Sequence, residues 1–190
     1  MVLAGLSQAI EARDPYSRGH SARASALAEI VARRLGWRGS RLSALRLGGL
    51  LHDVGKLNVD ASVLGKPGPL DEGERRQIRR HPITGARLIR PFGPLHPALP
   101  YVLFHHEWWD GSGYPSGRSR EQIPAGARVL AVADAFDAMT SNRPYRGALP
   151  VGVALGEVRA CSGTQFDPHV VHAFLAAWAA GELPNVAAAA

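Results

Sequence analysis

Residues 50–56 read Leu50-Leu51-His52-Asp53-Val54-Gly55-Lys56, and they end an apolar segment that begins near residue 42. The segment is apolar on nearly all sides at helical spacing, which predicts a buried central helix that ends at about residue 54. His52 and Asp53 place two polar groups at the end of this helix, where each needs a partner. A metal ion would satisfy both groups, and a hydrogen-bonded structural pair is the alternative.

Outward from this stretch, apolar residues recur with helical period in both directions along the chain. The predicted helices cover the segments 20–35, 126–141, 151–159 and 167–179, and one more helix ends near residue 105. No segment keeps the alternating period of a strand. The pattern predicts an all-α fold, a compact helical bundle.

Several local signals mark where these helices begin. Ser40 and Asp71 are predicted N-caps, and His81-Pro82 opens a helix because proline is tolerated at the first helical position. Val129, Val132, Phe136 and Met139 form a stripe that is expected to face the core. Residues 109–120 are rich in Gly, Ser and Pro, which predicts an exposed loop.

Length and composition indicate one globular domain. The chain has 190 residues, of which 46% are hydrophobic and 20% charged. We expect a single domain over residues 1–180, with a frayed tail over 181–190. The single cysteine, Cys161, excludes an internal disulfide and suits a reducing cytosol. No apolar stretch reaches the roughly 20 residues that span a bilayer, so we expect a cytoplasmic protein without a membrane partner.

The net charge of +6 favours an anionic partner. Nucleotide phosphates and nucleic acids would both satisfy this charge. The arginines are scattered, however, and no basic run is interleaved with aromatic residues. We therefore expect no direct binding of DNA or RNA.

The histidines are the most informative polar residues. Five of the eight, together with two aspartates, lie in settings that suit metal ligation: His20, His52, Asp53, His81, His105, His106 and Asp134. Imidazole and carboxylate ligands together suit Fe, Mn, Ni or Zn. Each residue alone also has a structural interpretation, as a hydrogen-bonded histidine or as an aspartate on a solvated face. The set as a whole favours a metal site.

Two pairs within this set constrain its geometry. His105 and His106 are neighbours and would point about 100° apart on a regular helix. Either the site lies against the end of that helix, or the two histidines serve different metals. Asp134 and Asp137 lie one turn apart, on the same face of their helix.

The combination of motifs resembles the HD-GYP branch of the HD phosphohydrolases. The resemblance covers about residues 6–178, in the right order and at compatible spacing. It is carried by His52-Asp53, Gly55-Lys56, His81-Pro82, His105-His106-Glu107, Asp110-Gly111-Ser112-Gly113-Tyr114-Pro115, Ala133-Asp134-Ala135 and Arg143-Pro144-Tyr145-Arg146. The stretches 11–20 and 165–168 resemble the opening and closing motifs of the family.

The resemblance implies a cyclic di-GMP phosphodiesterase that makes pGpG and, in some members, GMP. The implied metal ligands are His20, His52, Asp53, His81, His105, His106 and Asp134, with Asp53 bridging. The implied cofactors are two divalent cations, Fe or Mn ahead of Ni, Co or Zn. A hydroxide held between the two cations would attack phosphorus, since two nearby cations lower the pKa of a shared water.

The resemblance also assigns the substrate contacts. Lys56 would lie beside the scissile phosphate, and Gly113, Tyr114 and Pro115 would shape one side of the site. Asp137, Arg143 and Arg146 match positions that contact the nucleotide. The implied partners are cyclic di-GMP, sensory or receiver domains, diguanylate cyclase domains and a second copy of the chain as a homodimer.

One departure bears on the number of metals. Some family members carry a glutamate four residues before the first histidine ligand and bind a third metal there. Here that position is Tyr16. A phenol ionises near pH 10 and is a poor ligand for Mn or Fe(II), so we expect two metals.

Two alternatives remain open. The first is an HD phosphohydrolase for another nucleotide, which would have no need of the loop at Tyr114 or of residues 143–146. The second is a non-catalytic module that binds a cyclic dinucleotide or a protein. Family members that have lost catalysis usually lack the residues that match His52 or Asp53, and this chain has both.

Overall fold

The computed structural model describes residues 18–142 and 147–184, and within these ranges it contains helices and no β-strand. The α-helices run in the order α2 (His20–Arg34), α3 (Gly39–Leu51), α4 (Ala61–Leu64), α5 (Glu72–Arg79), α6 (His81–Ile89), α7 (Leu99–Phe104), α8 (Ala125–Thr140), α9 (Val151–Ala160) and α10 (Pro168–Ala179). Short 3₁₀ helices cover Val54–Asn58, Gly93–Ala98 and Arg120–Gln122. The all-α prediction is confirmed. No described helix has the length and apolar character needed to cross a membrane.

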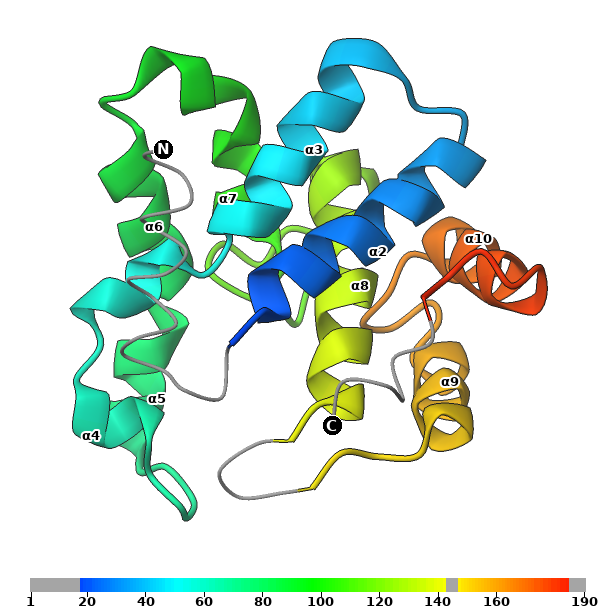
Figure 1. Ribbon diagram of the computed structural model, residues 1–190. Helices are drawn as coiled ribbons and strands as arrows, with labels where there is room; N and C mark the ends of the chain where they lie inside the picture. Colours follow the sequence, from blue (N-terminus) through cyan, green and yellow to red (C-terminus); the bar gives the residue numbers. More distant parts are fainter. Residues whose placement is uncertain (1–17, 143–146, 185–190) are drawn as a thin grey trace.

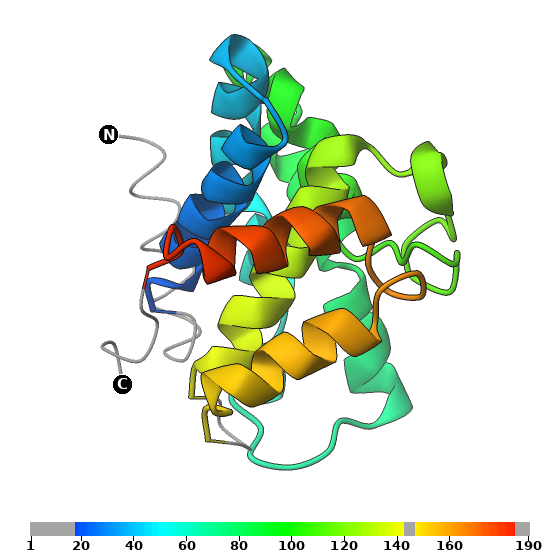
Figure 2. The same ribbon diagram turned by 90° about the vertical axis from the view of Figure 1, so that its right-hand side faces the viewer.

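Helix α8 lies at the centre of the fold (Figure 1). It packs against α2, which also packs along α3. Helices α9 and α10 cover a further side of α8 (Figure 2). The larger hydrophobic core lies between these helices, and it includes the predicted stripe on α8. Within it, the rings of Phe136 and Phe174 meet edge to face, with centroids 4.9 Å apart.

A second, smaller core holds the other half of the molecule together. It consists of Leu51, Val54, Ile89, Leu95 and Val102, which come from the end of α3, the following 3₁₀ helix, α6, the 3₁₀ helix before α7, and α7 itself. His52 and Asp53 lie in sequence between two of its members. The smaller core therefore fixes the turn that carries the HD pair.

Three helix starts can be compared with the sequence. Asp71 caps α5 in a capping box, because it accepts from the Glu74 amide at 2.8 Å while the Glu74 side chain accepts from the Asp71 amide at 2.8 Å. His81-Pro82 opens α6, as predicted. The Ser40 cap is wrong: α3 begins at Gly39 and no side chain caps it. Gly39 has φ of 56°, a conformation that glycine adopts readily, and the turn into the helix occurs there.

Helix α3 is also shorter than predicted. It ends at Leu51 rather than near residue 54, and Val54–Asn58 continue as a 3₁₀ helix. Gly55 explains the change, since a Cβ at this position would lie 2.0 Å from the carbonyl oxygen of His81. Glycine thus allows the chain to pack directly on the backbone of α6. Tertiary packing here overrides the helical period and leaves His52 and Asp53 in a turn.

Candidate metal centre

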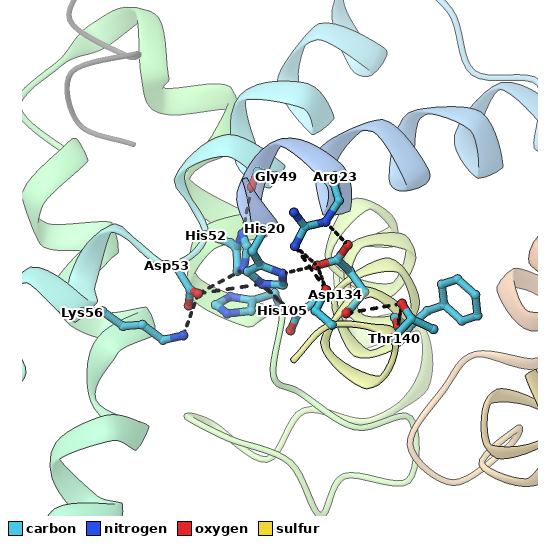
Figure 3. A network of polar contacts seen from close by, with 12 residues as sticks. His20, Arg23, Gly49, His52, Asp53, Lys56, His105, Asp134 and Thr140 are labelled. Carbon is cyan, nitrogen blue, oxygen red and sulfur yellow. Dashed lines mark hydrogen bonds and ion pairs between the residues drawn. The ribbon is translucent and has the colours of Figure 1, made fainter. Parts of the chain in front are cut away.

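The seven predicted metal ligands come from five separate segments and meet in one place. Figure 3 labels five of them, His20, His52, Asp53, His105 and Asp134. They come from the first residue of α2, the turn after α3, the first residue of α6, the two residues after α7, and the middle of α8. In that order they are His20, His52, Asp53, His81, His105, His106 and Asp134. Because His105 and His106 follow the end of α7, the site lies against a helix end, which is the first of the two arrangements considered for this pair.

The ligand atoms form overlapping groups. Within each group, one ligand atom per residue lies within 4.8 Å of the others; the groups are His20 with His52 and Asp134, His81 with His105 and His106, and His52 with Asp53 and His105. We call the first group the α2–α8 group and the second the α6–α7 group. The third group joins them.

Asp53 lies between these two groups. One carboxylate oxygen is 3.3 Å from Nε2 of His81, and the other is 3.5 Å from Nε2 of His52 and 4.0 Å from Nε2 of His20. Its two oxygens therefore face different groups, as a bridging carboxylate requires. The side chain is buried, and the carboxylate also accepts a hydrogen bond from Nζ of Lys56 at 2.6 Å.

Three histidines are oriented by the same kind of hydrogen bond to the backbone. In His52, His81 and His105, Nδ1 lies 2.8 Å from the carbonyl oxygen three residues earlier. A carbonyl only accepts hydrogen bonds, so Nδ1 carries the proton and Nε2 presents its lone pair to the centre. Metal-binding histidines commonly donate their second nitrogen in this way.

His20 is held differently. Its Nδ1 lies 2.7 Å from a carboxylate oxygen of Asp137, and its Nε2 lies 3.0 Å from Asp134. Asp137 is fully buried, and Arg23 donates to it from Nε at 2.7 Å and from Nη2 at 3.1 Å. Asp137 thus lies behind His20, at the ring nitrogen opposite the one that faces Asp134.

The protonation states suit cation binding. Burial lowers the pKa of His81 and of His106 to about 3, and burial and the neighbouring His106 lower the pKa of His105 well below its usual value. These three imidazoles are neutral at physiological pH, the form that binds metals. Burial would raise the pKa of Asp53, but Lys56 and the surrounding histidines lower it well below its usual value, so the carboxylate is charged.

His20 and Asp134 behave as a pair. Burial acts to lower the pKa of His20, but hydrogen bonds to Asp134 and Asp137 raise it to about 9. Burial acts to raise the pKa of Asp134, but His20 and the other histidines lower it well below its usual value. A proton on His20 therefore compensates the carboxylates when no cation does so.

The donor set fits divalent metal ions. Nε2 of His52 is buried and finds no hydrogen-bond partner in the described part of the chain. Nε2 of His81 and Nε2 of His105 face each other at 3.2 Å, although both rings already use Nδ1 as the donor. Buried polar atoms without partners are costly, and a cation with imidazole and carboxylate ligands would satisfy them together.

The loop of Gly113, Tyr114 and Pro115 forms one wall of the centre. The Tyr114 ring lies against His106, with centroids 4.8 Å apart and the planes tilted by 30°. A Cβ on Gly113 would lie 2.2 Å from the amide nitrogen of Trp108, so the loop packs on the backbone that follows the paired histidines. The prediction of an exposed loop is therefore only partly right, because Glu107 is buried and anchors the loop through the amides of Ser116 and Arg118.

A basic groove continues from this wall. It has a volume of about 630 Å³, and its lining includes Tyr114 and Pro115, the three arginines Arg76, Arg79 and Arg80, and one acidic residue, Glu72. The Arg79 guanidinium lies 4.7 Å from the centre of the Tyr114 ring. The groove thus offers positive charge next to the histidine cluster.

The remaining site predictions have different outcomes. Arg143, Arg146 and Tyr16 lie outside the described residues. Asp137 was expected to contact the nucleotide; that contact stays a prediction, and the burial of Asp137 behind His20 favours another role. Sequence reasoning missed Arg23 and the anchoring by Glu107. The signal for Arg23 was its spacing, since it lies three residues after His20 on the same helical face.

Comparisons with known proteins agree with this geometry. A family model described as "HD domain" matches residues 5–170. The chain is 41% identical to the cyclic di-GMP phosphodiesterase response regulator RpfG of Xanthomonas campestris, over 91% of this chain and 46% of that protein. It is 35% identical to the 3'3'-cGAMP-specific phosphodiesterase 3 of Vibrio cholerae, over 88% of this chain and 36% of the relative. The chain therefore spans less than half the length of these relatives.

Solved structures show the same fold. A crystal structure of the V. cholerae cyclic GMP-AMP phosphodiesterase V-cGAP3 superposes with a TM-score of 0.75 at 20% identity, covering 96% of this chain and 49% of that one. The HD domain of the Listeria monocytogenes phosphodiesterase PgpH superposes with a TM-score of 0.61 at 16% identity, covering 93% of this chain and 98% of that one. At these identities the likeness is one of fold.

Proposed function

Because the chain belongs to the HD domain family, in its HD-GYP branch, we propose that it is a metal-dependent phosphodiesterase that hydrolyses cyclic di-GMP to the linear dinucleotide pGpG. The observation that carries the proposal is Asp53, whose two carboxylate oxygens face different histidines at 3.3 and 3.5 Å. This arrangement fits two cations side by side, the form of site that many phosphodiester-cleaving enzymes use.

The seven residues of the cluster would hold the cations, and Fe or Mn suits their imidazole and carboxylate donors. When bound, two such ions supply an activated water for attack at phosphorus and neutralise charge on the phosphate oxygens. Asp53 would serve both ions, while each histidine would serve one of them. HD domains are metal-dependent, and the identity of the metal in this chain is part of the proposal.

The chain's own residues would bind and orient the substrate. Lys56 lies beside Asp53 with its side chain 16% exposed, where it would bring a positive charge to the phosphate under attack. Tyr114 closes one side of the centre through its contact with His106. Arg76, Arg79 and Arg80 line the adjoining groove, which would favour a substrate that carries more than one phosphate.

A second candidate substrate follows from the relatives. Those at 41% and 35% identity are named for cyclic di-GMP and for 3'3'-cGAMP, respectively. Both substrates are cyclic dinucleotides with two phosphodiester bonds, and the metal cluster would act on either. Discrimination between guanine and adenine must come from groups outside the cluster.

The test compares the two substrates directly. Purified protein loaded with Mn(II), or with Fe(II) under anaerobic conditions, is incubated with cyclic di-GMP and with 3'3'-cGAMP, and the products are separated by anion-exchange chromatography. We expect cyclic di-GMP to be converted to pGpG with the higher kcat/KM. Faster turnover of 3'3'-cGAMP would reverse the assignment, and turnover of neither would refute the phosphodiesterase proposal.

A further inference from the structure

His20 differs from the other oriented histidines in the group that binds its Nδ1. His52, His81 and His105 donate to backbone carbonyls, whereas His20 faces the carboxylate of Asp137 at 2.7 Å. A carboxylate is a stronger acceptor than a carbonyl, and its charge makes the imidazole a better electron donor at Nε2. The charge of Asp137 therefore strengthens electron donation from Nε2 of His20.

Asp137 is itself fixed by a second charged residue. Arg23 binds both of its oxygens, at 2.7 Å from Nε and 3.1 Å from Nη2, in the forked geometry that suits a carboxylate. The same guanidinium donates to the Ser141 hydroxyl at 3.2 Å and to the Arg18 carbonyl at 3.0 Å. Arg23 thus joins the first turn of α2 to the end of α8, and the carboxylate between them has little freedom to rotate.

The arrangement places the charged carboxylate of Asp137 in the protein interior. The Asp137 side chain has no exposed surface, while that of Arg23 is 29% exposed. A buried carboxylate is costly unless it is paired, and here it has the guanidinium on one side and the imidazole on the other. Asp137 does not line the groove, and its carboxylate lies at Nδ1 of His20, opposite the nitrogen that faces Asp134. Its position, with the carboxylate 2.7 Å from Nδ1 of His20, suits orientation of that histidine.

We propose that Arg23 and Asp137 are positioning residues that set the metal affinity of the α2–α8 group, formed by His20, His52 and Asp134, and leave the α6–α7 group, formed by His81, His105 and His106, unaffected. The inference rests on the metal centre of the proposed function and is independent of which cyclic dinucleotide is cleaved. It assigns Asp137 a role behind a metal ligand, in place of the nucleotide contact that the family resemblance implies.

The test measures the affinity of each metal equivalent, and comparison with His20→Ala assigns the weakened equivalent to a group. Metal-free protein is titrated with Mn(II) in competition with a chelator, and bound metal is counted by elemental analysis. For Asp137→Asn we expect one of two equivalents to bind about 10- to 100-fold more weakly, the usual cost of losing such a partner. Arg23→Gln should weaken the same equivalent, and Arg23→Lys, which keeps the charge but loses the fork, should fall between wild type and Arg23→Gln.

Two controls locate the effect. Arg33→Gln removes an exposed arginine of the same helix that binds Glu29, and both equivalents should keep their wild-type affinity. His20→Ala should weaken the same equivalent as Asp137→Asn, and Asp137→Asn should add little in the His20→Ala background. Additive losses in the double variant would overturn the proposal, because the two residues would then act separately.

A purely structural role predicts a different result. In that case Asp137→Asn and Arg23→Gln would lower the melting temperature of the metal-free protein and weaken both equivalents alike, and the proposal would be overturned. Unchanged affinity at both equivalents would overturn it as well. Failure to cleave any cyclic dinucleotide would refute the proposed function alone, because the readout here is bound metal.

Discussion

Asp53 is the residue that both groups of histidines approach. Its two oxygens lie 3.3 Å from His81 and 3.5 Å from His52, and the carboxylate also binds Lys56 at 2.6 Å. Removing it would withdraw a shared ligand, and the loss of any one histidine would leave the second cation with its full set. The position of Asp53 therefore gives a prediction about metal stoichiometry.

We expect Asp53→Asn to lose more bound metal than His81→Ala or His20→Ala, because an amide is a poor bridge between two cations. Elemental analysis of the three variants, purified in parallel, measures the difference. Activity should fall with the metal content of each variant. A normal metal content in Asp53→Asn would contradict the bridging role.

The seven candidate ligands were all identifiable from the sequence, because each stands at a helix end or beside an apolar stripe. How these ligands divide into groups was not identifiable from the sequence. The sequence left open whether His105 and His106 serve one site, and only the packing of α7 against α6 brings them to His81. Asp137 shows the limit more clearly: helical spacing put it on the same face as Asp134, but spacing alone could not show which of the two would lie behind His20.

Among the secondary-structure elements, the 3₁₀ helix Val54–Asn58 depends on one glycine. A Cβ at Gly55 would lie 2.0 Å from the His81 carbonyl oxygen and 2.6 Å from the Gly85 amide nitrogen. Both neighbours are backbone atoms and cannot swing aside. The contact holds the HD turn against the start of α6, where another metal ligand lies.

We expect Gly55→Ala to lower the free energy of unfolding by about 1–3 kcal/mol, the usual cost of overpacking, as measured by urea denaturation. It should also reduce metal content, because His81 must move. Gly156→Ala is the matched control, since a Cβ built at Gly156 in α9 would meet nothing within 4 Å beyond the backbone of its own helix. The control should be neutral or stabilise by about 0.5–1 kcal/mol. Equal stability of the two variants would contradict this account of the close approach.

Helix α5 carries a second prediction, which concerns the basic groove. Arg79 lines the groove and lies over the Tyr114 ring, whereas Arg75 on the same helix does not line it and pairs with Glu72 at the groove's edge. Arg79→Ala should raise KM for cyclic di-GMP about 10-fold or more, in line with roughly 1.5–3 kcal/mol for a charged hydrogen bond. Arg75→Ala should leave KM unchanged. If both variants behave alike, the groove does not contact the substrate.

The helices themselves were largely predictable, and the errors share a cause. Periodicity gave α2, α8, α9 and α10 to within about a residue or two at each end. It failed at the end of α3 and at Ser40, where a glycine allows a backbone conformation or a close contact that hydrophobic pattern does not report. Composition likewise predicted the loop after His106 but could not reveal that Glu107 anchors it.

At the scale of the whole molecule, the residues of the candidate metal centre come from helices of both hydrophobic cores. Its ligands come from α2 and α8 on the side of the larger core and from α6 and α7 on the side of the smaller one. Cations bound there would join the two halves of the fold. Metal binding should therefore raise stability as well as support catalysis.

We expect metal-loaded protein to melt at a higher temperature than metal-free protein. At a free metal concentration about 100-fold above the dissociation constant, one site stabilises the native state by about 2.7 kcal/mol. For a domain of this size that corresponds to a rise in Tm of about 5–10 °C. Differential scanning calorimetry with and without Mn(II) measures the shift, and Asp53→Asn should show a smaller one. An unchanged Tm would contradict a centre that links the two cores.

The central claim is that the clustered histidines and aspartates form a metal centre that cleaves a cyclic dinucleotide. The most direct measurement is the rate of cyclic di-GMP hydrolysis as metal is returned, one equivalent at a time, to protein stripped by a chelator. The account predicts no turnover without metal and full turnover only when about two equivalents are bound, as expected for a two-metal site. Full hydrolysis by the metal-free protein would contradict it.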